Sequence, residues 1–128
     1  MTAVMGLMAV GVGAALGAWA RWGLAAAMNA LVPLLPLGTL AANLIGGYLI
    51  GVALEFFLQH ALLPVEWRLF VITGFLGGLT TFSTFSGEAL ELLLHQRYGW
   101  AMLLIGSHLA GSLAMTLLGL HTVRWLTA

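Results

Sequence analysis

The stretch Gly74-Phe-Leu-Gly-Gly-Leu-Thr-Thr-Phe-Ser-Thr-Phe-Ser-Gly-Glu88 places a polar cluster inside an otherwise apolar part of the chain. Five of the seven residues from 80 to 86 carry hydroxyl groups, and the other two are Phe82 and Phe85. Gly77-Gly78 followed by Thr80-Thr81 also predicts a helix break. Irregular backbone at membrane depth is tolerated where it is buried in protein or lines a cavity. The stretch therefore indicates a functional break within a membrane-spanning helix.

The composition around this stretch is that of a membrane protein. Hydrophobic residues make up 62% of the 128 residues, charged residues only 6%, and the mean hydropathy is +1.07. Soluble domains carry about 25% charged residues, so most of this surface must face lipid. The charges balance to zero, which leaves no basic patch for nucleic acid. Without cysteine or aspartate, and without an HExxH or P-loop motif, no enzyme class is indicated.

Charges and helix breakers divide the chain into four hydrophobic segments, each near the 20 residues that a bilayer span needs. We expect one all-α membrane domain over residues 1–128, with the third helix broken near the bilayer midplane. Asn29, Pro33 and Pro36 mark the first loop, residues 59–68 form a polar turn, and residues 95–99 form a tight turn. The expected spans are about Val4–Met28, Gly38–Leu58, Trp67–Leu94 and Trp100–Trp125.

The arginines do not choose an orientation for these four spans. Arg68 and Arg124 fall on the side of the termini, whereas Arg97, with Arg21 toward it, falls on the other side. Topology normally follows an excess of Lys and Arg in cytoplasmic loops. The balance favours dual topology, in which oppositely inserted copies pair as an antiparallel dimer. The alternative is a weak bias that Arg68 alone resolves.

Glycines four residues apart occur in three of the spans, as Gly13/Gly17, Gly47/Gly51 and Gly74/Gly78. Small residues on one face let helices approach closely in lipid. The pattern therefore predicts tight helix packing, although glycine is common in membrane helices in any case.

The polar cluster offers two kinds of ligand. A broken helix frees backbone carbonyls, which coordinate alkali cations, and the hydroxyls form a line of donors. Phe82 and Phe85 share a helix face, and a phenyl ring has a positive edge that can face an anion. The alternative is that the hydroxyls bond back to carbonyls one turn earlier and the rings only pack.

Two other spans supply further neutral polar groups. Asn43 lies four residues after Thr39, and His108 lies four residues before Ser112. Together with the cluster they predict a polar track of mostly neutral donors, which suits an anion better than a cation. The alternatives are that Asn43 only joins two helices and that His108 is a structural hydrogen-bonding residue.

Two charged residues lie within the spans. Arg21 either snorkels to the interface or sits at a pore mouth and attracts anions. Glu88 is deeper, and an intramembrane carboxylate is a functional candidate. Glu55, Glu66 and Glu91 are interpreted as boundary charges.

The chain resembles the Fluc (CrcB) fluoride channels along nearly its whole length. The resemblance rests on three motifs, which are Gly13-Ala-Ala-Leu-Gly-Ala-Trp-Ala-Arg21, Gly38-Thr-Leu-Ala-Ala-Asn43 with Gly46-Gly47 and Gly51, and Gly74–Phe85 with Glu88. It implies an antiparallel homodimer in the bacterial inner membrane. Such a dimer would hold two pores that passively export cytoplasmic fluoride and reject chloride.

The resemblance also implies roles for individual residues. The ring edges of Phe82 and Phe85 would line the pore, and Asn43 would donate its amide to fluoride. Thr80, Ser83 and Thr84 are candidates for the polar track, and carbonyls of Gly77 and Thr80 from both subunits would bind a central sodium ion. We expect Glu88 to be a pore-end group that contacts Thr39. The chain departs from the family at Leu104, where a tyrosine is common, so His108 and Ser112 are the candidates from this span.

Two rival functions fit a chain of this size. A small dual-topology multidrug/proton antiporter needs a carboxylate in its first span, but the only charge there is Arg21. A purely structural membrane subunit would gain nothing from a costly, hydroxyl-rich helix break.

Overall fold

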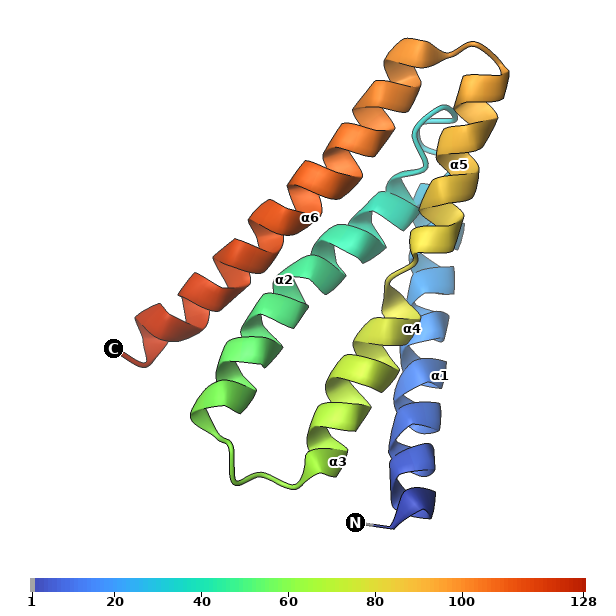
Figure 1. The fold of residues 1–128 in the computed structure, drawn as a ribbon. Helices are drawn as coiled ribbons and strands as arrows, with labels where there is room; N and C mark the ends of the chain where they lie inside the picture. The colour runs from blue at the N-terminus through green and yellow to red at the C-terminus, as the bar shows by residue number, and fades with distance from the viewer. Residues whose placement is uncertain (1) are drawn as a thin grey trace.

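A computed structural model describes residues 2–128 and contains four helical segments long and apolar enough to cross a membrane (Figure 1). The first is α1 (Ala3–Met28) and the second is α2 (Leu37–Gln59). The third runs through α3 (Val65–Arg68), η1 (Leu69–Leu76), α4 (Gly77–Leu79) and α5 (Phe82–Leu94), and the fourth is α6 (Tyr98–Leu126). The predicted four-span, all-helical fold is confirmed, and both ends of the described chain lie at the same end of the bundle.

The predicted break in the third span is confirmed. Thr80 and Thr81 are extended, with φ/ψ of −89°/154° and −150°/113°, and they separate α4 from α5. The preceding η1 is a π-helix of 8 residues, which the sequence pattern did not predict. The expected polar turn through Arg68 was wrong by four residues, because Pro64 starts α3 at Val65. A proline's fixed φ suits the start of a helix, where no intrahelical N–H bond is lost.

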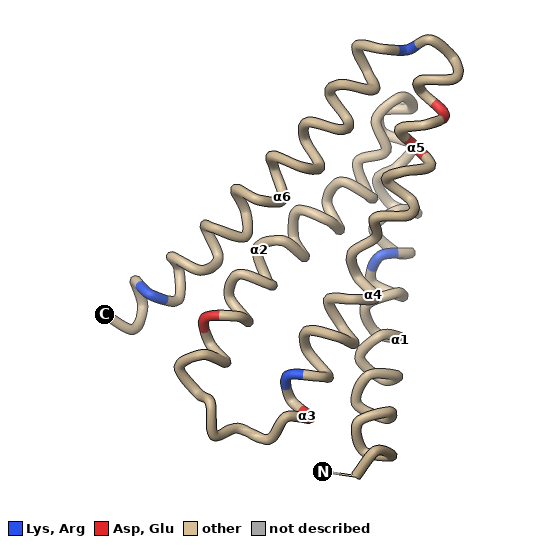
Figure 2. The backbone as a smooth tube through the Cα atoms, in the orientation of Figure 1, with Lys and Arg blue, Asp and Glu red and all other residues tan. Residues whose placement is uncertain are grey.

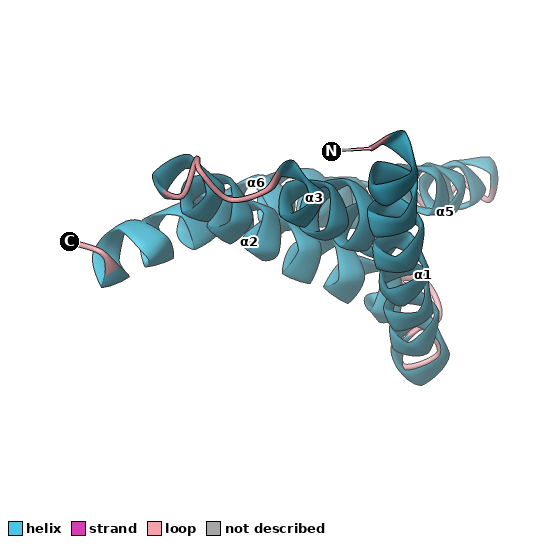
Figure 3. Ribbon diagram, turned by 90° about the horizontal axis from the view of Figure 1, so that it is seen from below, coloured by secondary structure: helices cyan, strands magenta, loops and turns pink. Residues whose placement is uncertain are grey.

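Glycines fasten the four spans into two close pairs, α1 with η1 and α4, and α2 with α6. A methyl group added at Gly74 would lie 2.8 Å from the Val10 carbonyl oxygen, and one at Gly51 would lie 2.9 Å from the Leu120 backbone nitrogen. Both distances are too short for carbon, so only glycine permits these backbone contacts. The predicted glycine packing is confirmed. Figure 3 shows α1 on one side of the molecule and α2 with α6 on the other.

The two pairs diverge toward the end that carries residues 60–64 (Figure 1). A cavity of about 520 Å³ lies there between α2 and the third span, lined by Val52 and Phe56 on one side and Trp67 and Phe75 on the other. The walls of this cavity are apolar. The pairs converge at the opposite end, where α2 meets α5.

The charged residues occur mostly near the ends of the spans (Figure 2). At the end with the termini, Arg124 Nε lies 3.2 Å from Glu55 Oε1 and joins α6 to α2. Glu55 is 6% exposed, so this residue, which the sequence suggested was a boundary charge, is buried between the two helices. Arg21 and Glu88 are the exceptions, since both lie within spans.

Candidate functional site

Asn43 of α2 binds the backbone of the helix break. Its Nδ2 donates to the Thr81 carbonyl oxygen at 3.1 Å, and its Oδ1 accepts from the Thr81 N–H at 2.8 Å. A backbone left unpaired inside a membrane costs several kcal/mol per group. One amide side chain thus satisfies both backbone groups of a residue that belongs to neither α4 nor α5.

The same amide determines the protonation of His108 on α6. Asn43 Nδ2 lies 2.9 Å from His108 Nδ1. An amide nitrogen can only donate, so Nδ1 must accept and the proton of the neutral ring must sit on Nε2. His108 is 3% exposed, and its Nε2 is buried without a partner in the described part of the chain. The result is a buried N–H donor that is free to bind an acceptor.

Phe82 and Phe85 sit on the first turn of α5 with ring centroids 5.4 Å apart and ring planes at 66°. The predicted shared face is confirmed, but the two rings differ in environment. Phe85 is 7% exposed and lies 4.7 Å from the His108 ring, whereas Phe82 is 73% exposed. The chain itself leaves the Phe82 ring uncovered.

These groups line one groove of about 490 Å³ between α2, α6 and the break. The groove brings together seven of the residues singled out from the sequence, which are Asn43, Gly77, Thr80, Phe82, Phe85, His108 and Ser112. It also contains Thr116, whose Oγ1 donates to the Gly47 carbonyl oxygen at 2.9 Å. Sequence reasoning missed Thr116, although it continues the four-residue spacing of His108 and Ser112.

The hydroxyl cluster divides into separate groups. Thr80 Oγ1 donates back to the Leu76 carbonyl oxygen at 2.8 Å, as the simpler alternative predicted. Thr81 Oγ1 caps α5 by accepting from the Thr84 N–H at 3.1 Å, and it contacts the hydroxyls of Ser83 and Thr84, each at 3.2 Å. Ser83 and Thr84 are exposed and do not line the groove within this chain.

The break removes the usual partners of two carbonyls. In a continuous helix the Gly77 carbonyl oxygen would accept from Thr81 N–H, but that group donates to Asn43 Oδ1. The Thr80 carbonyl oxygen would accept from Thr84 N–H, which donates to Thr81 Oγ1 instead. Both carbonyls belong to residues that line the groove.

Arg21 of α1 reaches the same break from its other side. Its Nε donates to the Gly78 carbonyl oxygen at 3.0 Å, so it caps the end of α4. The sequence predicted that Arg21 either snorkels to the interface or sits at a pore mouth. Neither prediction included a bond from Arg21 to the helix break.

The predicted contact between Glu88 and Thr39 is confirmed. Thr39 Oγ1 donates to Glu88 Oε2 at 2.8 Å, and Glu88 Oε1 is buried without a partner in the described chain. The Thr39 N–H donates to Asn29 Oδ1 at 3.1 Å, which fixes the start of α2. Thr39 and Glu88 lie about one helical turn from Asn43 and Phe85, toward the α5–α6 turn.

The four spans, the broken third helix and its polar groove define a multi-pass membrane protein with a site built at bilayer depth. Residues 8–120 match the family described as CrcB-like protein, Camphor Resistance (CrcB). The chain belongs to the CrcB family.

Several curated relatives are similar to this chain over nearly its full length. A protein of Nitrosospira multiformis is 63% identical over 120 residues, which cover 94% of each chain. Proteins of Cupriavidus pinatubonensis and Ralstonia pickettii are 65% and 66% identical, over 95% and 94% of this chain and 97% and 95% of theirs. All three are named fluoride-specific ion channel FluC.

Proposed function

We propose that this protein is a passive fluoride channel. The observation that carries the proposal is His108, which lines a groove of uncharged polar, aromatic and aliphatic groups and whose buried Nε2–H has no partner in the described residues. An acceptor-only anion would satisfy that donor. The names of the relatives supply the identity of the anion.

Neutral donors suit conduction, because a channel must bind an ion weakly enough to release it. In the proposed pore, His108 and Ser112 donate to fluoride, and Phe82 and Phe85 present their ring edges to it. Both Asn43 N–H groups are already engaged, with the Thr81 carbonyl oxygen and His108 Nδ1, so Asn43 acts by holding His108 with its proton on Nε2. Thr39 and Glu88 continue the path toward the α5–α6 turn. The hydroxyls of Ser83 and Thr84 would reach the path only in an assembly, and Arg21 would raise the local anion concentration near the break.

We propose an antiparallel homodimer with two pores as the working assembly. The exposed Phe82 ring supports it, since a second copy could cover the ring and close the open side of the groove. The balanced arginines favour insertion in both orientations. Cysteine labelling of Leu62→Cys from one side of a sealed vesicle tests this: half the copies should react, and complete or absent labelling contradicts dual topology.

A central sodium ion fits the freed carbonyls of Gly77 and Thr80. Unwound carbonyls coordinate sodium in other membrane proteins, and the described residues contain no cluster of three or more His, Cys, Asp or Glu for another metal. Two carbonyls from one chain are too few, so a second copy would complete the site. Sodium would supply positive charge that holds the two breaks together.

In a bacterial inner membrane such a channel would release cytoplasmic fluoride down its electrochemical gradient. The test is fluoride efflux from proteoliposomes with valinomycin present, followed by fluoride and chloride electrodes. Fast fluoride release without chloride release supports the proposal. Efflux of cationic dyes that requires a proton gradient, with no fluoride release, would favour the multidrug antiporter instead.

A further inference from the structure

A second cavity, of about 350 Å³, lies beyond Glu88 at the α5–α6 turn. Its walls come from the loop of residues 29–36, from the last turns of α5 and from the turn itself, and include Leu34, Pro36, Glu88, Glu91, His95 and Arg97. At about 30 Å³ per water molecule, the cavity has room for roughly ten waters. It is large enough to hold a hydrated ion.

The cavity continues the line of polar groups that begins in the groove. Phe85, Glu88 and Glu91 of α5 and its C-cap residue His95 follow one another at intervals of three or four residues, which places them on one face. Glu88 accepts a hydrogen bond from Thr39, one helical turn beyond the groove residue Asn43, and it also lines the cavity. The buried path and the open end of the bundle therefore meet at Glu88.

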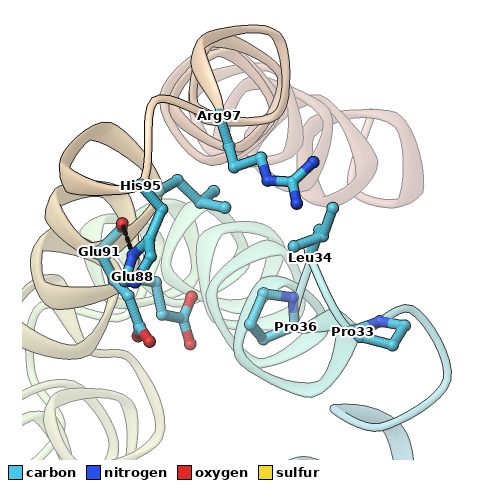
Figure 4. Close-up of a pocket in the computed structure, with 8 residues that line it drawn as sticks. Pro33, Leu34, Pro36, Glu88, Glu91, His95 and Arg97 are labelled. Atoms are coloured by element: carbon cyan, nitrogen blue, oxygen red, sulfur yellow. Dashed lines mark hydrogen bonds between the residues drawn. The ribbon is translucent and has the colours of Figure 1, made fainter.

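Opposite charges lie on different walls of the cavity. In Figure 4 the Arg97 guanidinium extends over the cavity toward Leu34, and the carboxylates of Glu88 and Glu91 lie on the other side. No carboxylate in the described residues is within salt-bridge distance of Arg97. His95 Nδ1 donates to the Glu91 carbonyl oxygen at 2.8 Å, which holds its ring against the wall. Arg97 is thus a positive charge left open to an anion.

We propose that this cavity is the outer antechamber of the anion path, in which Arg97 attracts fluoride and offsets the carboxylates that the ion must pass. The inference rests on the proposed function. A positive charge at the mouth of a low-dielectric path raises the local anion concentration, and the effect weakens as salt shortens the Debye length from about 30 Å at 0.01 M to about 3 Å at 1 M.

Occlusion tests the position of the path. The chain contains no cysteine, so Leu34→Cys and the control Leu62→Cys can each be modified selectively with a bulky neutral methanethiosulfonate on both sides of the membrane. Leu62 is fully exposed in the loop of residues 60–64 and lines neither cavity nor groove. Modified Leu34→Cys should lose at least tenfold in fluoride efflux, and modified Leu62→Cys should lose none. Full flux through verified, modified Leu34→Cys overturns the antechamber.

A second experiment changes the charge at position 97. It also tests the antechamber if Leu34→Cys does not fold. Arg97→Cys carrying a cationic reagent should conduct at least twice as much fluoride at low ionic strength as the same variant carrying an anionic reagent. The difference should vanish when gluconate raises the ionic strength. Equal flux at low ionic strength, or a reversed order, overturns the inference. Absence of fluoride flux from the unmodified wild type would instead overturn the proposed function itself.

Discussion

Asn43 and Thr81 exchange two hydrogen bonds, with the side-chain amide of one meeting both backbone groups of the other. This pair of bonds joins α2 to the non-helical segment of the third span, between α4 and α5. The bonds hold the break open and position Asn43 Nδ2 toward His108. A single side chain therefore supports the fold and sets the chemistry of the groove.

Asn43→Asp should impair conduction. Aspartate keeps the oxygen that accepts from Thr81 N–H but lacks both N–H donors, and it adds a negative charge to the groove. Without the donor to Nδ1, His108 is no longer held with its proton on Nε2. Loss of the charge-assisted hydrogen bond from Nε2 to fluoride costs about 1.5–3 kcal/mol, so fluoride efflux should fall roughly 10- to 100-fold. Asn29→Asp is the matched control, because it retains the oxygen that accepts from Thr39 N–H. Normal efflux in Asn43→Asp would rule out a role for this amide in preparing His108 to donate.

Three of the four histidines should differ in which ring nitrogen carries the proton. His108 should carry its proton on Nε2, because Asn43 donates to Nδ1. His60 and His95 should carry theirs on Nδ1, which donates to the carbonyls of Phe56 and Glu91. Nitrogen-15 spectra of the reconstituted protein at a pH where histidine is neutral can distinguish the two forms. A His108 signal of the Nδ1–H form would refute the donor assignment.

Phe82→Ile and Phe85→Ile should both abolish fluoride conduction, since isoleucine has no positive ring edge. Their stabilities should differ. Phe85 is buried, so its loss should lower thermal stability as well, whereas the exposed Phe82 should be replaced with little cost to the subunit. Phe56→Ile, which changes a ring outside the groove, should conduct normally. Flux equal to wild type in both variants would contradict the ring-edge argument.

Gly51→Ala should destabilise the contact between α2 and α6. A methyl group there would collide with the Thr116 carbonyl oxygen of α6, and overpacking of this kind costs about 1–3 kcal/mol. Gly106→Ala on α6 is the control, because a methyl group at that position meets nothing within 4 Å. Thermal unfolding in detergent should show a clear loss for the first variant and none for the second.

The Glu55–Arg124 pair should behave as a unit. Arg124→Gln leaves the buried Glu55 carboxylate without its cation, whereas Arg124→Gln combined with Glu55→Gln removes both charges. The double variant should therefore unfold at a higher temperature than Arg124→Gln alone. The opposite order would mean that an unpaired Glu55 carboxylate costs the fold little.

Much of the fold was predictable because it depends on local signals. Hydrophobic length located the four spans, glycine spacing indicated close packing without saying which helices pair, and Gly77-Gly78 before Thr80-Thr81 indicated the break. The contact between Thr39 and Glu88 was also predicted and is present. The π-helical geometry of η1 was not, since Leu69–Leu76 has no residue pattern that distinguishes it from an α-helix.

The site was predictable as a set of residues but not as a network. Spacing within each helix suggested Asn43, Phe85 and His108, yet only their meeting across three helices determines which nitrogen of His108 keeps its proton. The bond from Arg21 to Gly78 was missed for the same reason, because it joins residues 57 positions apart. The pore roles of these residues, the sodium ion and the dimer stay predictions.

The arrangement of the two glycine-fastened pairs has a consequence for how this protein can change over time. The walls of the groove belong to different pairs, and each pair is held by backbone contacts that tolerate no side chain. Substitutions on the groove surface can therefore accumulate while the scaffold keeps its spacing. Ion preference could drift in such a protein long before its stability did.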